Sequence, residues 1–253
     1  KYYSCFYIIV YIIFVNFLKE FLRCFYNPDI WIFYSHKKIV LKYKDTILGP
    51  FWNVINSIFL ISVLSFSYFL FLNPDNFENF IYRLSISIFL WLFISSFLNE
   101  STTLLKYKVE LLNEKKIDIK NFVCENIYYN FIILLHSFPI IIILFFITDF
   151  KFQLNLMMTF FGLFLILINL ILLGYLITIL SAIYKDIQKI VENLVYALFF
   201  ATPIIWSENM VAEKIQKLLI FNPFYHFIVL FRDPLMNNVN EKFYESFFIC
   251  LLL

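Results

Sequence analysis

Long runs without charged residues are the feature of this sequence that most restricts its fold. A soluble helix would interrupt such runs with a solvated face. Five windows hold no Asp, Glu, Lys or Arg apart from their ends: Phe51 to Leu72, Leu84 to Asn99, Ile127 to Thr148, Leu156 to Ile183, and Ile190 to Trp206. At 1.5 Å per residue, a window of about 22 residues covers about 33 Å, enough for a hydrocarbon core of about 30 Å. The sequence therefore predicts an all-α integral membrane protein.

Composition supports this class and excludes others. Of the 253 residues, 62% are hydrophobic and 15% are charged, whereas soluble domains have about 45–50% and about 25%. The three glycines are too few and too scattered for a GxxxxGK[ST] phosphate loop or a GxGxxG fingerprint, so the chain does not bind ATP through either motif. The four cysteines are far apart and predict neither a metal site nor a disulfide framework.

The chain divides into three expected regions. Residues 1–24 form an apolar segment that either spans the membrane or lies at its surface. Residues 25–50 form an amphipathic interface helix, and residues 51–253 form the transmembrane domain. A sixth span begins at Phe243 in FYESFFICLLL, and we expect it to be incomplete because about ten apolar residues do not cross a bilayer.

The distribution of basic residues predicts the orientation. Apart from Lys1 at the start of the sequence, thirteen Lys and Arg residues lie before Phe51, in the 100–126 loop and near residue 186, against six on the opposite side. Positive loops stay cytoplasmic, so residues 25–50 are expected on the cytoplasmic side of a multi-pass membrane protein. Because the basic residues cluster by loop, they indicate membrane orientation and no nucleic-acid partner.

The predicted interface helix runs from Asp29 to Asp45. Its apolar stripe is expected to dip into the membrane boundary: Ile32, Ile39, Val40 and Tyr43. The opposite face is expected to meet anionic headgroups or the acidic surface of a partner: Ser35, Lys38, Lys42 and Asp45. Gly49 and Pro50 then turn the chain into the first span. From these residues alone, a simple membrane anchor helix is an equal alternative.

An external segment, 207–242, is long and apolar for an aqueous loop. Asn222 is placed to cap a helix whose first residue is Pro223, and Asp233-Pro234 is expected to stop it after Arg232. The helix is too short to span, which predicts a re-entrant or lid helix. A packed loop cap without any gating role is the alternative.

Five blocks of sequence, in order, resemble the membrane subunits of ABC-type polysaccharide exporters, which move O-antigen, capsule or teichoic acid chains. The blocks are KKIVLKYKDTILGPFW (37–52), LWLFISSFLNE (90–100), IYYNFIILLHS (127–137), YKDIQKIVENLVYALFFATPIIWS (184–207) and NPFYHFIVLFRDPL (222–235). The resemblance covers about Lys37 to Leu235 and is strongest for the O-antigen branch.

This resemblance implies six spans per subunit and a homodimer that encloses a pore for lipid-linked polysaccharide. It also implies two copies of a separate ATP-binding subunit, which carries ATP and Mg, and no cofactor on this chain. The proposed spans hold no Asp, Glu, Lys or Arg apart from their ends. Ion-coupled carriers place such residues at membrane depth, so the energy is expected to come from the partner.

The expected functional residues fall into four groups. Those for coupling to the ATPase are Lys38, Lys42, Asp45, Glu100, Leu105, Lys106, Val109, Glu110, Leu112, Lys185 and Asp186. The signature turn is Gly49 and Pro50. The external gate comprises Pro203, Trp206, Asn222, Pro223, Tyr225, His226 and Arg232. Aromatic residues on a possible glycan path are Tyr68, Tyr82, Trp91, Tyr128, Tyr129 and Tyr196.

The competing reading is a membrane-embedded enzyme of glycan assembly, such as a transferase or polymerase. Such an enzyme needs positioned acid and base carboxylates or a metal-binding acidic cluster. The external acidic pairs are Asp75 with Glu78 and Glu208 with Glu213, and neither resembles a metal-ligand set. If the chain is an enzyme, we expect it to transfer glycan alone. If it is a transport subunit, we expect export that depends on a partner.

Overall fold

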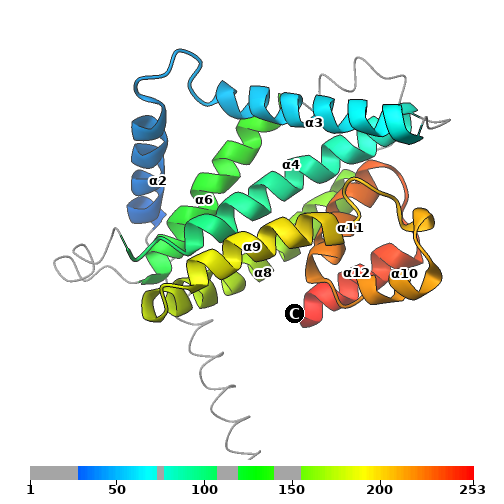
Figure 1. Cartoon of the computed structure of the whole chain (residues 1–253). Coiled ribbons are helices and arrows are strands. Elements are labelled where there is room, and N and C mark those ends of the chain that lie inside the picture. The colour runs from blue at the N-terminus through cyan, green and yellow to red at the C-terminus, as the bar shows by residue number, and fades with distance from the viewer. Residues whose placement is uncertain (1–27, 73–76, 107–118, 140–154) are drawn as a thin grey trace, which may run out of the picture.

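The computed structural model describes residues 28–72, 77–106, 119–139 and 155–253, and these residues are helical with short connections (Figure 1). The elements are α2 (Pro28–Tyr43), α3 (Phe51–Leu72), α4 (Phe77–Ser101), α6 (Ile119–Ser137), α8 (Leu156–Ile183), α9 (Ile187–Ala201), the 3-10 helix η1 (Glu208–Met210), α10 (Glu213–Leu219), α11 (Pro223–Leu235) and α12 (Glu241–Leu252).

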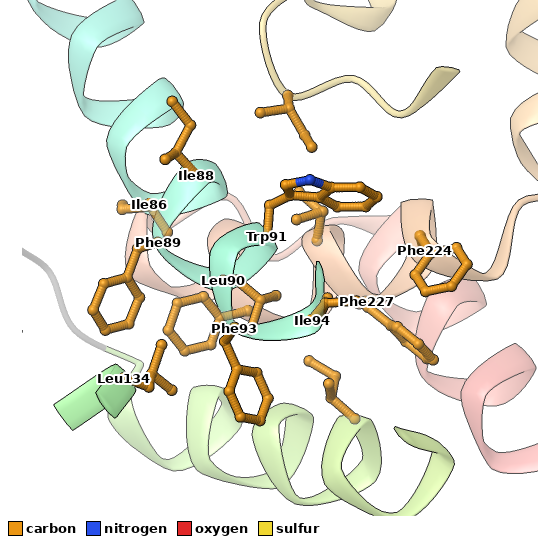
Figure 2. Close-up of a cluster of buried hydrophobic side chains, with 14 of the residues drawn as sticks. Ile86, Ile88, Phe89, Leu90, Trp91, Phe93, Ile94, Leu134, Phe224 and Phe227 are labelled. Atoms are coloured by element: carbon orange, nitrogen blue, oxygen red, sulfur yellow. The ribbon is translucent and has the colours of Figure 1, made fainter. Parts of the chain in front are cut away.

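Helix α4 forms the centre of the bundle. It contacts α3, α6, α8, α9 and α11, and most of its side chains are buried. Figure 2 shows Phe89, Phe93 and Leu134 gathered on one side of α4, with Trp91 on the other. The Trp91 ring packs edge-on against Phe224 of α11 at a centroid distance of 5.9 Å. Because aromatic side chains bury large areas, this layer joins α4 to both α6 and α11.

Three helices within the described residues are long and apolar enough to cross a membrane: Phe51–Leu70, Phe77–Ser101 and Met157–Ile183. The expected windows at Phe51 to Leu72 and Leu156 to Ile183 match α3 and α8 to the residue. Helix α4 begins seven residues before its expected start at Leu84, and its first two turns include Glu78 and Arg83. Helix α4 therefore includes two charged residues that lie before the charge-free window predicted for this span.

The other expected spans are helical, but they are shorter or more polar than α3 and α8. Helix α6 begins at Ile119, eight residues before the expected window, and carries Lys120, Glu125 and several amides. The later part of that window, to Thr148, falls largely outside the described residues. Helix α9 spans Ile187–Ala201 and α12 begins at Glu241, close to the expected Ile190 and Phe243. The six-span arrangement remains a prediction.

The junction before the first span has the expected form. Helix α2 ends at Tyr43 and α3 begins at Phe51, with Gly49 between them at a φ of 52°. That left-handed conformation favours glycine because a Cβ would be crowded by the backbone. Figure 1 shows α2 running across the direction of α3 at one end of the bundle. The apolar region 1–24 lies outside the described residues.

Helix α11 is enclosed by the rest of the chain. Every side chain from Phe224 to Leu235 is buried, mainly against α8, α12 and α4. A Cβ built on Gly162 of α8 would lie 2.6 Å from the carbonyl oxygen of Leu230. That carbonyl would normally accept from the N–H of residue 234, which is Pro234 and has none. Because residue 162 is a glycine, α8 packs directly against the Leu230 carbonyl, which has no N–H donor from Pro234.

The predicted end of α11 is wrong by three residues. The helix continues past Arg232 to Leu235 with Pro234 in its last turn. A proline costs only one bond there, and the Met236 N–H donates to the carbonyls of Arg232 and Asp233 at 3.1 and 3.2 Å. Asn237 then takes a φ of 54°, a conformation that Asn tolerates, and the helix ends.

Candidate functional site

The polar face of α2 packs onto α6 and α4. The Ser35 hydroxyl donates to the Glu125 carbonyl at 2.9 Å, and Ser35 is fully buried. Lys38 Nζ lies 2.6 Å from Glu100 Oε2 and 3.9 Å from the centre of the Tyr129 ring. Lys42 Nζ donates to the Tyr129 hydroxyl at 2.8 Å. These three contacts, one turn apart, fix α2 to the bundle.

This orientation differs from the predicted one. The face with Ser35, Lys38 and Lys42 was expected to point at headgroups or a partner, but two of its side chains bond to Glu125 and Glu100 of the same chain. The reason is that α6 and the end of α4 present carboxylates and amides there. Val40 of the expected apolar stripe points away from the bundle and is 64% exposed. Phe33 and Leu41 are also exposed.

A buried amide network continues inward from this contact. Asn126 Nδ2 donates to the Phe97 carbonyl and to Ser101 Oγ, both at 3.1 Å. Thr178 Oγ1 of α8 donates to the Ser101 carbonyl at 3.1 Å. Asn130 Nδ2 donates to Asn126 Oδ1 at 3.0 Å. Helices α2, α4, α6 and α8 are therefore joined by hydrogen bonds at one end of the bundle.

Tyr43 forms a second link, between the last turn of α2 and the start of α3. Asn53 Nδ2 donates to the Tyr43 hydroxyl at 2.6 Å. Burial raises the pKa of Tyr43, the Asn53 hydrogen bond opposes that rise, and the Glu100 carboxylate adds to it. The hydroxyl therefore remains protonated and neutral at any physiological pH.

The remaining residues expected at the coupling surface lie at the same end of the bundle. The α8–α9 turn, the end of α4 and α2 gather there in Figure 1. Lys185 and Asp186 are exposed, as are Asp45 and Lys106, whereas Leu105 is buried. Val109, Glu110 and Leu112 lie outside the described residues.

At the opposite end, the expected gate residues meet around α11. The Asn222 side chain accepts from the Phe224 N–H at 3.0 Å, which confirms the predicted cap. The same side chain donates to Thr202 Oγ1 at 3.0 Å. Arg232 Nη1 donates to the Pro203 carbonyl at 3.0 Å, and its Nε pairs with Asp233 Oδ1 at 3.0 Å. Both ends of α11 are thus tied to the segment that follows α9.

His226, Tyr225 and Trp206 complete this group. His226 Nε2 lies 2.9 Å from the Ile220 carbonyl and Nδ1 lies 2.9 Å from Ser246 Oγ. A carbonyl only accepts, so Nε2 carries the proton and the Ser246 hydroxyl of α12 donates to Nδ1. Trp206 packs against a small cluster that includes Tyr225, and its Nε1 donates to the Phe200 carbonyl at 2.9 Å.

Sequence reasoning missed several polar partners at this end. Asp233 is buried with Arg232, and Lys242 Nζ of α12 lies 2.5 Å from Glu208 Oε2 of η1. Arg83, in the early turns of α4, faces the same group of charges. A charged residue beside an apolar window, as Arg83 is beside Leu84, was the available signal, because such residues need partners near membrane depth.

The expected glycan-path aromatics fall into different environments. Tyr82, Tyr129, Trp91 and Tyr68 are buried in the bundle. The Tyr128 ring packs edge-on against Trp31 of α2 at a centroid distance of 5.2 Å. Tyr196 on α9 is 73% exposed. A role in guiding a glycan remains a prediction for all six, and Tyr196 has its ring most open to a ligand.

Three apolar helices of membrane-spanning length in the described part of the chain, with α4 at the centre of the bundle, are typical of an integral membrane protein. Over 230 residues, 87% of this chain and 85% of the relative, the sequence is 22% identical to an O-antigen export system permease protein RfbA of Klebsiella pneumoniae. A second protein of that name and organism is 21% identical over the same shares of each chain. No protein-family model matches the chain.

These relatives confirm the resemblance to the membrane subunits of ABC-type polysaccharide exporters, on the O-antigen branch. The similarity covers 87% of the chain, which is more than the five motif blocks together. Because both relatives are named as permeases, the chain is similar to transport subunits.

Proposed function

We propose that this chain is the pore-forming permease subunit of an ATP-driven exporter that moves lipid-linked polysaccharide, of O-antigen or capsule type, across the bacterial inner membrane. Two copies would enclose the path, and two copies of a separate ATP-binding subunit would supply the energy with ATP and Mg. The observation that carries the proposal is similarity to O-antigen export permeases along 87% of the chain.

The contacts of α2 support a coupling role for its end of the bundle. A force applied to α2 or to the exposed Lys185-Asp186 turn reaches the spans through side chains that are already bonded. Ser35 joins α2 to α6, Lys38 joins it to α4, and Thr178 extends the network to α8. Energy released by a partner docked there would thus move several helices together.

The opposite end has features of a gate. Helix α11 is buried as a whole, yet it is held at its ends by polar contacts from Asn222 and Arg232. Such contacts break and re-form at lower cost than a continuous apolar interface when water can replace the lost partners. We infer that α11 shifts as a unit against α8 and α12 when the external path opens.

The decisive experiment reconstitutes export. Co-expression with the ATP-binding subunit encoded beside it is expected to yield a stable complex and to restore surface polysaccharide in a permease-deletion strain. A partner subunit with an inactive ATP site is expected to leave the complex intact and abolish export. Export by this chain without any ATP-binding subunit would contradict the proposal.

The same preparations test the enzyme alternative. A membrane-embedded transferase or polymerase would elongate or transfer glycan when purified alone with donor substrate. We expect no change in the length of the glycan in that assay. Two results together would favour the enzyme. The purified chain would transfer glycan, and polysaccharide export would be unchanged in the permease-deletion strain.

A further inference from the structure

A cavity of about 250 Å³ lies between α3, α4 and α6, next to the end of α2. Its polar lining includes Asn56 and Ser57 in the first two turns of α3, and Ser96 near the end of α4. At 1.5 Å per residue, Ser57 lies about 9 Å along α3 from its start. The cavity therefore opens within the membrane half that carries α2, at headgroup depth and below.

The cavity wall is apolar on one side and polar on the other. Phe89, Phe93 and Leu134 form an apolar side, and Figure 2 shows these three side chains together beside α4. The other side is made of amides and hydroxyls, with no carboxylate in the lining. Several of these groups already bond within the protein: the Ser57 hydroxyl donates to the Asn53 carbonyl, and Asn53 Nδ2 donates to the Tyr43 hydroxyl. Polar groups inside an apolar bundle cost free energy unless they are bonded, so a polar occupant is indicated by the lining residue that keeps an unused acceptor.

Asn130, one of the lining residues, carries an unused acceptor in the cavity wall. Its amide nitrogen faces three oxygens, Asn126 O, Asn126 Oδ1 and Glu100 Oε2, so the side-chain orientation is fixed by the network. Asn130 is 1% exposed and lines the cavity, and its Oδ1 accepts no hydrogen bond. An orphaned buried acceptor costs about 1–3 kcal/mol, which a bound donor would recover.

Lys42 supplies positive charge at the α2 end of the same cavity. Its ammonium has three donors, one of which reaches the Tyr129 hydroxyl at 2.8 Å. Lys38, one turn earlier, is paired with Glu100, but no carboxylate among the described residues pairs with Lys42. The cavity thus offers a cation at its mouth and an unused acceptor inside.

We infer that this cavity binds the phosphate-bearing, hydroxylated headgroup of an anionic lipid. The phosphate lies against Lys42, a headgroup hydroxyl donates to Asn130 Oδ1, and the acyl or prenyl chain leaves toward the membrane. The volume is about eight times a water molecule's share of the liquid, enough for a phosphate with a short polyol or one sugar ring. The inference requires only that the chain resides in a membrane, so its failure would leave the export proposal standing.

The test measures lipid binding to the delipidated full chain in detergent, by native mass spectrometry. The probes are phosphatidylglycerol, phosphatidylcholine of the same chain length, and a short-chain polyprenyl phosphate bearing one sugar. We expect at least one of the two anionic lipids to bind at one per chain, and phosphatidylcholine to bind about tenfold more weakly or not at all. Binding of phosphatidylglycerol identifies a bulk membrane lipid as a source, and binding of the polyprenyl lipid alone identifies a carrier lipid.

Matched variants locate the site. Lys42→Met is expected to weaken binding about tenfold, the loss of one charge-assisted bond. Lys44→Met, two residues on, exposed and outside the cavity lining, is expected to leave binding unchanged. Ser96→Phe fills the cavity and should abolish binding, whereas Ser62→Phe, on the exposed side of α3, should not. Equal effects within either pair, or equal binding of phosphatidylcholine, would overturn the inference.

Discussion

At the scale of single residues, two ion pairs lie in contrasting environments. Lys38 and Glu100 join two helices where their side chains are about one-third exposed, and Arg232 and Asp233 form a pair that is almost fully buried. These environments predict different responses to mutation. A partly exposed pair contributes about 1 kcal/mol or less, whereas breaking a buried pair costs about 3–5 kcal/mol.

The first prediction concerns the link between α2 and α4. Lys38→Glu or Glu100→Lys alone brings like charges together and is expected to reduce export severalfold, with a thermal midpoint lowered by only a few degrees. The double variant restores the attraction and is expected to recover export. Lys37→Glu, on the exposed side of α2, serves as the charge-matched control. A double variant no better than either single variant would show that the pair has no role in coupling.

The second prediction concerns the buried pair at the other end. Arg232→Met leaves Asp233 without its partner and is expected to destabilise the chain by about 3–5 kcal/mol. Adding Asp233→Asn removes the isolated charge and should recover part of that loss. Thermal unfolding of the three purified proteins in one detergent provides the comparison. If the double variant is as unstable as Arg232→Met, the lost Pro203 contact, and not the stranded carboxylate, is the dominant cost.

At the scale of elements, close approach between helices depends on two glycines in α8. Gly162 lies against the backbone of α11, and Gly174 lies against the Phe97 ring of α4, 2.4 Å from a built Cβ. A ring can turn aside, but a helix carbonyl cannot move without the whole helix. The same methyl group should therefore have different consequences at the two positions.

This difference gives the third prediction. Gly174→Ala is expected to destabilise the chain by about 1–3 kcal/mol, and Phe97→Leu in the same chain should recover most of the loss by shortening the side chain. Gly162→Ala should displace α11, and Leu230→Ala should not rescue it because the obstacle is a carbonyl oxygen. The measurements are thermal midpoints of the single and double variants. Rescue at both positions would mean that α11 adapts as easily as a side chain.

Helix boundaries were predictable where composition changes sharply. The limits of α3 and α8 coincide with the charge-free windows, and Asn222-Pro223 marks the start of α11 as expected. The start of α4 was not predictable in this way because Arg83 lies in its early turns, in the electrostatic field of Glu208 on η1 and of Arg232 and Asp233 on α11. Those partners lie more than 120 residues further along the chain, so no local pattern could reveal them.

The direction of α2 was misjudged for a related reason. An amphipathic pattern shows that a helix has two faces, but not which face meets the protein. The prediction directed the polar face at headgroups or a partner, whereas α6 offers buried Glu125, Asn126 and Asn130 to α2 within the same chain. Of the candidate site, the cap at Asn222 and Pro223 was predicted from local sequence, and the gate role of the surrounding residues remains a prediction from the family resemblance. The buried amide network was not predicted, because single Asn residues carry no periodic signal.

At the scale of the whole molecule, the two polar ends of the bundle should lie on opposite sides of the membrane. This is the fourth prediction. In a cysteine-free background, Lys185→Cys at the α8–α9 turn is expected to react with a membrane-impermeant maleimide only after the inner membrane is opened. Asn209→Cys, in exposed η1, is expected to react in cells with a permeable outer membrane and an intact inner membrane. Labelling of both from the same side would contradict the orientation derived from the basic residues.

Helix α4 is surrounded by protein along most of its length, whereas α3 and α8 turn many bulky side chains, such as Phe59, Phe66 and Phe160, away from it. In a saturation scan, the outward positions of α3 and α8 should accept exchanges among Leu, Ile, Val and Phe with little penalty. Positions on α4 should reject both larger and smaller replacements, since every direction is already occupied. Tolerance to mutation would then distinguish the inner helix from the outer ones without any structural measurement.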